Sequence, residues 1–237
     1  HLNGLIRLET GSVTVDGIDL TAKKPDLKLL RRKVGMVFQY PESQLFADTV
    51  FKDVIYGPKN MKKTPDECLA LARSAMELTG LEFDAFKDRS PFELSGGEKR
   101  RAAIAGVIAC EPEYLIMDEP SAGLDPKGKE DIYRLVGQIK ARTSPTVIII
   151  SHDIDEITQY ADRIAVFGEG KIFADFKTRD IAKYADILRA RGLDVPLTVK
   201  LCEMLRARGL DIDEIKPDGF ISEVIGAYRR KNGEGGL

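Results

Sequence analysis

The sequence predicts an α/β protein built around a parallel sheet. Two apolar runs, 114–117 and 146–150, lack the alternation of half-exposed strands, which is typical of strands buried on both faces. Between them, Asp125 and Pro126 begin a helix of about sixteen residues. A strand, a helix and a second strand in this order imply a parallel pair with a right-handed crossover.

Composition excludes several classes of protein. The 237 residues are 43% hydrophobic and 31% charged, as in a globular protein, and the length suffices for one large α/β domain or for one domain plus an appendage. The formal net charge of −2 provides no basic field for nucleic acid. The longest aliphatic run, 147–150, is far shorter than the ~18 residues of a membrane span. Three cysteines without metal-like spacing argue against a disulfide framework and favour a reducing compartment.

The amino-terminal third contains an arm, a strand and the start of a helical region. Residues 1–6 resemble the tail of a helix without an N-cap, so we expect the natural chain to extend upstream. Residues 11–20 alternate around Asp16-Gly17 and predict a β-hairpin arm. A short strand over 34–38 ends at Gln39.

Residues 41 to about 106 have helical character. Thr64 and Glu67 form a predicted capping box around Pro65, and the helix that follows stops at Gly80. Its apolar spacing predicts an inward face made of Leu69, Ala72, Met76 and Leu78.

The carboxyl-terminal part predicts a hairpin and a helical tail. Strands over 164–167 and 171–174 flank a turn at 168–170, and residues 178–231 are helical. The heptapeptide Leu-Arg-Ala-Arg-Gly-Leu-Asp occurs twice, at 188–194 and 205–211. The duplicates mark either a pairing surface or two helix ends. Residues 232–236 are predicted to be disordered.

The strongest local motif is Leu-Ser-Gly-Gly-Glu-Lys-Arg-Arg at 94–101. A capping box explains Ser95 and Glu98 but not Gly96 and Gly97, which each cost up to ~1 kcal/mol relative to Ala in a helix. Free N–H groups and a positive dipole end at a helix start attract anions, and glycines let an anion approach closely. The motif therefore predicts contact with phosphate.

Polar residues also follow three predicted strands. Asp118 and Glu119 end the 114–117 strand at the carboxyl edge of the sheet, where α/β proteins bind ligands. Asp118 suits Mg²⁺ bound through water, and Glu119 suits polarisation of an attacking water. His152 follows the 146–150 strand and can donate a hydrogen bond to phosphate or water. Gln39, at the end of its own strand, can touch a metal and a water.

Together these residues resemble the ATP-binding cassette (ABC) ATPases. Residues 94–98 are similar to the family's signature motif, and 115–119 to its Walker B motif. Residues 121–125 resemble the D-loop, His152 the switch histidine and Gln39 the Q-loop glutamine. The resemblance implies an ABC ATPase domain over 1–177, with a parallel-sheet P-loop NTPase core, an antiparallel β arm and a helical subdomain at about 41–106. A helical extension then spans 178–237.

A finer resemblance follows Gln39. The segment Tyr-Pro-Glu-Ser-Gln-Leu-Phe at 40–46 is similar to the Q-loop of energy-coupling factor (ECF) transporter ATPases, which include cobalt, nickel and vitamin importers. In that group the C-terminal extension helps two ATPases associate. Pro41, Leu45 and Phe46 form either a docking surface beside the Q-loop or part of the core of the helical subdomain.

The chain departs from the family in one respect. No Gly-x-x-x-x-Gly-Lys-Ser/Thr P-loop occurs in the 237 residues, and the residue that stacks on adenine cannot be located. Either the chain is a fragment of a complete ATPase, or it is a half-site subunit that caps ATP held by a partner. Because Gln39, Asp118, Glu119 and His152 act on nucleotide held by the same chain's P-loop, we expect a fragment.

The resemblance also implies cofactors, partners and a mechanism. ATP and Mg²⁺ bind between two ATPase subunits, identical or mixed. Asp118 and Gln39 hold the metal, Glu119 polarises water and His152 orients the γ-phosphate. Ser95, Gly96, Gly97 and Glu98 close over nucleotide on the other subunit, and Asp125 connects the two sites.

A membrane coupling protein and a substrate-binding membrane component complete the importer implied by the resemblance. The ATPase is then peripheral, at the cytoplasmic face of the membrane. The alternative is an ABC ATPase without a transport role, although repair members carry long coiled coils and translation members two cassettes. No nucleic-acid partner is expected.

Overall fold

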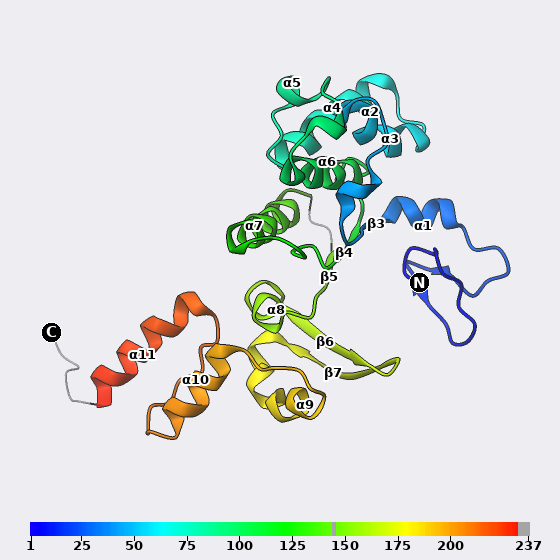
Figure 1. Ribbon diagram of the computed structural model, residues 1–237. Coiled ribbons are helices and arrows are strands. Elements are labelled where there is room, and N and C mark those ends of the chain that lie inside the picture. The colour runs from blue at the N-terminus through cyan, green and yellow to red at the C-terminus, as the bar shows by residue number, and fades with distance from the viewer. Residues whose placement is uncertain (144–145, 232–237) are drawn as a thin grey trace. The chain divides into compact units, whose positions relative to one another are not determined.

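The computed structural model describes residues 1–143 and 146–231, which divide into two compact units, His1–Ile150 and Ser151–Leu237 (Figure 1). The predicted disorder at 232–236 lies outside the described residues, and the predicted domain boundary at 177/178 stays a prediction. Among the described residues no helix has both the length and the apolar character needed to cross a bilayer.

The first unit contains a parallel sheet, as predicted. Strands β3 (Val34–Val37), β4 (Tyr114–Asp118) and β5 (Thr146–Ile150) lie in the order β3-β4-β5. Both pairs are parallel, with Val37 opposite Met117 and Asp118 opposite Ile150. The central strand β4 is buried on both faces, because Leu115, Ile116 and Met117 are at most 5% exposed.

The strand over 146–150 is not buried as predicted. Ile148 and Ile150 are 36% and 48% exposed. In the described residues β5 pairs only with β4, so it is an edge strand, and alternate residues face opposite sides of the sheet. An unbroken apolar run therefore does not show which face of a strand is covered.

A β arm and a helix precede the sheet. Strands β1 (Thr14–Val15) and β2 (Ile18–Asp19) are antiparallel, which confirms the predicted hairpin. Asp16 and Gly17 both have positive φ, 47° and 77°, as a two-residue type I′ turn requires. Helix α1 (Leu27–Lys33) leads directly into β3.

The predicted helix tail at residues 1–6 is wrong. These residues form one hydrogen-bonded turn, in which the N–H of Gly4 donates to the carbonyl of His1 at 2.8 Å. A single such bond does not offset the entropy needed to nucleate a helix.

Most of the chain that connects β3 to β4 is helical, as predicted (Figure 1). They are α2 (Val50–Val54), α3 (Tyr56–Asn60), α4 (Pro65–Leu78), α5 (Phe83–Phe86) and α6 (Gly96–Ile108), with 3-10 turns η1 (Pro41–Gln44) and η2 (Pro91–Glu93). After β4, α7 (Pro126–Thr143) forms the predicted crossover helix.

Helix α4 has the predicted capping box of Thr64 and Glu67, and Gly80 beyond its end has φ 77°. The predicted inward face was correct for Ala72, Met76 and Leu78, but Leu69 is 45% exposed. The buried stripe instead begins at Cys68, four residues before Ala72 and thus on the same helix face.

One hydrophobic core joins the sheet and the helices of the first unit. It contains Val37 of β3, Leu115 and Met117 of β4, Met76 of α4 and Ile104 of α6, among other residues. Helix α6 also packs closely on β3, because a Cβ atom at Gly35 would lie 3.0 Å from a methyl group of Val107. The glycine is therefore required for this helix-to-sheet contact.

The second unit contains the predicted hairpin and helices. Its elements are α8 (Ile154–Tyr160), β6 (Arg163–Gly168), β7 (Lys171–Lys177), η3 (Thr178–Tyr184), α9 (Ala185–Ala190), α10 (Leu197–Arg206) and α11 (Pro217–Lys231). Strands β6 and β7 are antiparallel, and their buried residues pack with α9 and α10. A second small core forms where Cys202 of α10 meets Phe220 of α11.

The duplicated heptapeptides are two helix ends with the same geometry. In each, the N–H of the second leucine donates to the carbonyl of the first at 3.0 Å, and the intervening glycine (Gly192 or Gly209) has φ 73° or 76°. This is a Schellman stop, which explains the glycine and the flanking leucines. The helix-end alternative accounts for the repeat without a pairing surface.

Candidate functional site

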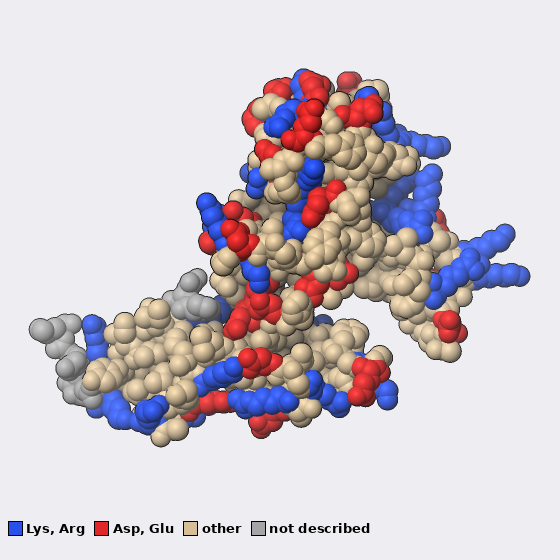
Figure 2. All heavy atoms as spheres, viewed as in Figure 1, with Lys and Arg blue, Asp and Glu red and all other residues tan. Residues whose placement is uncertain are grey.

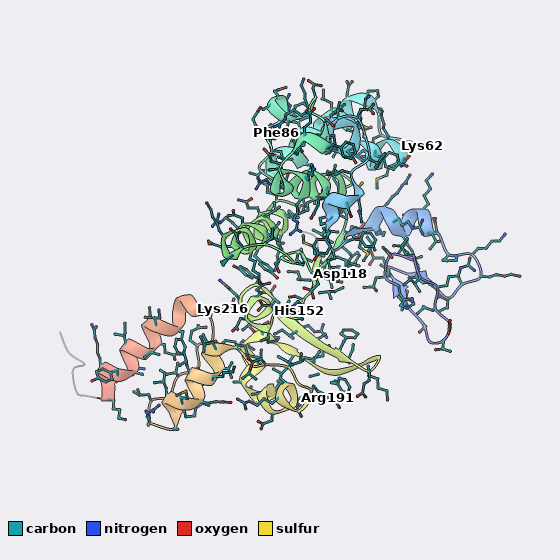
Figure 3. All side chains as sticks on the ribbon, viewed as in Figure 1. Lys62, Phe86, Asp118, His152, Arg191 and Lys216 are labelled. Carbon is teal, nitrogen blue, oxygen red and sulfur yellow. The ribbon has the colours of Figure 1, made fainter. Side chains whose placement is uncertain are left out.

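The carboxyl edge of the sheet holds the two predicted acids. Asp118 is the last residue of β4 and is half-buried (Figure 3), and Glu119 follows it. Because Val37 of β3 lies opposite Met117, Gln39 reaches the same edge two residues after β3 ends, and it is exposed. The structure thus brings Gln39, Asp118 and Glu119 to one edge.

Glu119 has an unusual backbone conformation for a glutamate. Its φ is 47°, in the left-handed region that side chains larger than Asn and Asp rarely adopt. Its N–H donates to the carbonyl of Ile150 at 2.9 Å, and its carbonyl accepts the N–H of Ala122 at 3.0 Å. These bonds tie Glu119 to β5 and to the turn that follows β4.

The predicted capping box at the start of α6 is confirmed. The Ser95 N–H and hydroxyl donate to Glu98 Oε2 at 2.8 and 2.7 Å, and the Glu98 N–H donates to the Ser95 hydroxyl at 3.4 Å. Hydrogen bonds from the Ser95 side chain and backbone hold the pKa of Glu98 below its ordinary value.

Gly96 and Gly97 are not required by any contact within the described chain. A Cβ atom at Gly96 would meet nothing within 4 Å, and one at Gly97 only the Arg101 guanidinium at 3.9 Å. Neither glycine has a positive φ, so alanine fits the backbone at both positions. The two glycines leave the first turn of α6 open to something outside this chain.

Sequence reasoning missed Arg100, on the second turn of α6. Its side chain is buried, at 6% exposure, and makes a two-bond ion pair with Glu42 of η1. Burial alone would raise the pKa of Glu42, but the hydrogen bonds and charge of Arg100, together with a backbone hydrogen bond, hold that pKa below its ordinary value. No local signal identifies the pair, because its residues are 58 positions apart.

The two remaining predicted site residues are Asp125 and His152. The Asp125 carboxylate accepts the N–H of Gly128 at 2.8 Å and so caps α7, which gives this exposed residue a structural role in its own chain. His152 belongs to the second unit, two residues after β5 ends. Its place at the sheet edge stays a prediction.

The segment after Gln39 divides between core and surface. Leu45 is buried, at 8% exposure, whereas Phe46 is 59% exposed. The Phe46 ring packs edge-on against Tyr56, with ring centres 4.9 Å apart, and Asp53 accepts the N–H groups of Phe46 and Ala47. Leu45 therefore belongs to the core, as one of the two alternatives expected, and Phe46 belongs to an exposed aromatic pair, for which docking stays a prediction.

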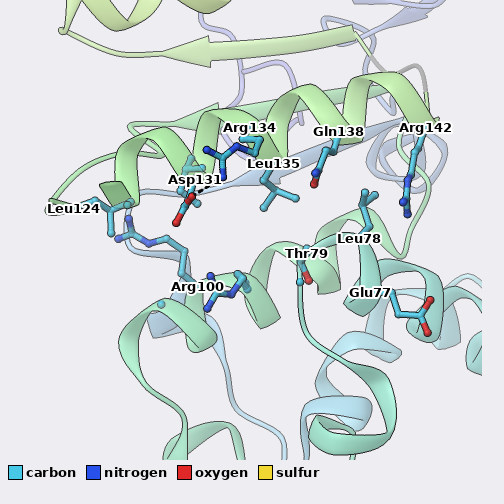
Figure 4. A pocket seen from close by; sticks show the side chains of 15 residues that line it. Glu77, Leu78, Thr79, Arg100, Leu124, Asp131, Arg134, Leu135, Gln138 and Arg142 are labelled. Atoms are coloured by element: carbon cyan, nitrogen blue, oxygen red, sulfur yellow. Dashed lines mark hydrogen bonds and ion pairs between the residues drawn. The ribbon is translucent and has the colours of Figure 1, made fainter. Parts of the chain in front are cut away.

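A cleft of about 370 Å³ lies between α7 and the ends of α4 and α6 (Figure 4). Gly97 and Arg101 of α6 line it, together with Leu78 and Gln138. Of the predicted site residues only Gly97 reaches this cleft, so the cleft is separate from the sheet edge that holds Asp118.

Surface charge and possible metal ligands were compared with the predictions from sequence. Figure 2 shows acidic and basic side chains intermingled over the helices of the first unit, as the net charge of −2 leads one to expect. Residues 1–143 and 146–231 contain no group of three or more His, Cys, Asp or Glu side chains placed to hold a metal. All three cysteines are free, so the predicted lack of a disulfide framework is confirmed.

Comparison with known proteins identifies the class. Residues 1–122 match the ABC transporter family. The chain covers 80% of the structure of CbiO1 from Clostridium perfringens, described as part of the ABC transporter complex CbiONQ, with 85% of this chain aligned, 36% identity and a TM-score of 0.69. It also covers 77% of a dimeric ATP-binding cassette bound to ADP and Pi, with 74% of this chain aligned, 28% identity and a TM-score of 0.63. The chain belongs to the ABC transporter family and has the fold of its ATPase domain.

Particular relatives narrow the class further. The chain is 45% identical to the energy-coupling factor transporter ATP-binding protein EcfA2 of Clostridium perfringens, over 95% of this chain and 76% of the relative. It is 49% identical to the protein of the same name from Symbiobacterium thermophilum, over 85% of this chain and 69% of the relative. The predicted family and fold are therefore confirmed.

Proposed function

We propose that this chain is the ATP-binding and hydrolysing subunit of an energy-coupling factor importer. The names of its relatives support the transporter class. The observation that carries the ATPase proposal is the open glycine pair at the start of α6, which no contact within the described chain requires. A helix N-terminus stripped of side chains suits the terminal phosphate of a nucleotide.

Residues near the carboxyl edge of the sheet activate water and bind the metal ion. Glu119 polarises the attacking water, and His152 orients the γ-phosphate. The Asp118 carboxylate and the Gln39 amide oxygen are hard oxygen donors at one edge, and they fit Mg²⁺ that keeps most of its water. When bound, Mg²⁺ neutralises charge on the transferred phosphate.

Two copies, or this chain and a second ATPase subunit, complete each site. Ser95, Gly96 and Gly97 contact nucleotide on the other subunit, with Glu98 holding Ser95 in place, and Asp125 connects the two sites. These 237 residues contain no P-loop motif, so the loop that wraps the phosphates comes from outside them.

The exposed aromatic pair beside the Q-loop supports docking of a membrane coupling protein. Phe46 and Tyr56 are 59% and 53% exposed, and their edge-on packing presents a preformed apolar surface. Through that protein and a substrate-binding membrane component, hydrolysis powers uptake of a vitamin or metal ion. The chain then works at the cytoplasmic face of the membrane without crossing it.

The test of the ATPase proposal is Glu119→Gln in the natural full-length protein. Turnover falls by ~10²–10⁴, the usual weight of general base catalysis, while ATP-driven association of the subunits persists. Glu111→Gln is a matched control, because Glu111 also has a positive φ (51°) but precedes β4 at its opposite end. Turnover of Glu119→Gln within threefold of wild type would contradict the proposed role.

The test of docking is Phe46→Ala in the assembled transporter. Recovery of the coupling protein with the ATPase falls, whereas Phe167→Ala, at a 70% exposed phenylalanine of the second unit, leaves recovery unchanged. Equal recovery with both variants would place the docking surface elsewhere.

A further inference from the structure

The Arg100 guanidinium is saturated with hydrogen bonds. Its Nε and Nη2 donate to the two oxygens of Glu42 at 3.2 Å, and Nη1 donates to the carbonyl of Pro120 at 3.2 Å. Nη1 and Nη2 also donate to the carbonyl of Ala122, each at 3.2 Å. These five contacts match the five N–H groups of a guanidinium, and the lysine ammonium has only three.

These contacts join three separate segments that carry predicted site residues. Arg100 lies on α6, one turn after Gly96, and Glu42 lies on η1, three residues after Gln39. Pro120 and Ala122 belong to the turn that begins at Glu119. Residues near the signature, the Q-loop and the end of β4 are thus bound to one side chain.

A second contact joins two of the same segments. A Cβ atom at Gly123 would lie 3.7 Å from Cε1 of Tyr40, so the Tyr40 ring packs beside the turn after β4. Tyr40 and Glu42 therefore hold that turn at neighbouring places, one by its ring and one through Arg100. A movement of η1 would therefore displace the turn through the Tyr40 ring and through the ion pair of Glu42 with Arg100.

The turn needs external support because of Glu119. A glutamate at φ 47° is strained, and the surrounding structure has to hold it there. The bond from Ala122 N–H to the Glu119 carbonyl closes the turn from within, and Arg100 binds the carbonyls of Pro120 and Ala122 from α6. The position of the Glu119 side chain follows from how firmly this turn is fixed.

We propose that Arg100 is a positioning residue that fixes Glu119 for hydrolysis and makes its position depend on Glu42 of η1. Arg100 acts through the turn and does not itself touch nucleotide. The inference rests on the proposed role of Glu119. It also gives a route by which a partner docked beside Phe46 changes hydrolysis: displacement of η1 pulls on Glu42, and the shared guanidinium then shifts the turn.

The experiment compares Arg100→Lys with Arg101→Lys in the natural full-length protein within its transporter. Lysine keeps the charge at position 100, but its three N–H groups cannot serve the four acceptor oxygens, so kcat falls about tenfold or more. The KM for ATP changes less than threefold, so the loss falls on kcat, as repositioning of Glu119 predicts. Arg101 is the matched control, because the described residues offer its buried Nε no hydrogen-bond partner. Arg101→Lys keeps kcat within twofold.

Glu42→Gln is the second variant and keeps the protein foldable. It preserves the shape of the side chain but removes the charge, so it lowers kcat by about threefold. Combined with Arg100→Lys it lowers kcat by less than the product of the two single effects, because both act on one network. Independent effects of the two variants would overturn the coupling to η1.

The variant Arg100→Lys/Glu119→Gln separates this inference from the proposed function. If Arg100 acts through Glu119, the double variant is no slower than Glu119→Gln alone. If Glu119→Gln is inactive but Arg100→Lys has a normal kcat, the role of Arg100 alone is overturned. If Glu119→Gln is active, the proposed function itself is overturned. A lower melting temperature for Arg100→Lys with unchanged kcat shows a structural role and refutes positioning.

Discussion

Replacing Gly96 or Gly97 by alanine separates what folding needs from what nucleotide binding needs. In a helix, glycine is less favourable than alanine by about 0.5–1 kcal/mol, because it loses more backbone freedom on folding. A Cβ at Gly96 meets nothing within 4 Å, and one at Gly97 makes an ordinary contact of 3.9 Å with Arg101. No clash opposes the gain, so each substitution should stabilise the protein by about 0.5–1 kcal/mol.

The same methyl group obstructs a phosphate that approaches the first turn of α6. Loss of one donor to a developing charge costs about 10²–10³ in turnover, and we expect Gly97→Ala to lower ATPase turnover by that factor. A stabilisation of 1 kcal/mol raises the melting temperature by about 2–4 °C for a chain of this size. The expected result is therefore a protein that melts higher and hydrolyses ATP far more slowly.

Thermal unfolding and steady-state ATPase assays on the full-length protein measure both effects. Gly137→Ala is the control, because Gly137 lies on α7 and its Cβ would also meet nothing within 4 Å. It should raise the melting temperature without changing turnover. If Gly96→Ala or Gly97→Ala melts lower while Gly137→Ala melts higher, the fold itself needs the glycines. If either melts higher and keeps turnover within threefold, nothing approaches this turn.

Three further predictions concern local chemistry. Above its unfolded pKa of about 4.5, ionised Glu98 stabilises the capping box, and this contribution disappears as the pH falls through the lowered pKa of the folded state. Glu98→Gln should keep the cap but abolish this pH dependence of thermal unfolding. Glu98→Ala should lower the stability by about 1 kcal/mol. A Cβ at Gly57 would overlap the Cys110 Sγ, so Gly57→Ala should destabilise the protein by about 1–3 kcal/mol in denaturant unfolding. Adding Cys110→Ala should restore most of the loss unless α3 is strained for another reason. Burial raises the pKa of Cys110 to about 11, so iodoacetamide at pH 8 should modify this thiol far more slowly in the folded protein than in urea-unfolded protein. Mass spectrometry measures both rates, and equal rates would contradict the burial of Cys110.

Local interactions were the most predictable from sequence. The capping box of Ser95 and Glu98 lies within four residues, and the turn at Asp16-Gly17 needs only its own two backbones. The central strand β4 was also predictable, because burial on both faces leaves an unbroken apolar run.

Features that depend on distant residues could not be predicted. In the sequence Arg100 is one of three consecutive basic residues, and its buried pairing depends on where Glu42 lies in three dimensions. The exposure of Ile148 was missed for a similar reason, since a β-branched run has the same sequence whether or not another element covers it. Leu69 was misplaced because Cys68, a small apolar residue, defines the buried stripe instead.

The shared core of the first unit has a consequence for how the protein opens. Since Met76 and Ile104 of the helices pack in one cluster with Leu115 and Met117 of the sheet, neither layer can lose its packing alone. Amide protons of α6 and β4 should therefore exchange with one common free energy of opening under native conditions. The second unit has cores of its own, around Ile181 and Ile212, so its protons belong to a separate cooperative exchange group.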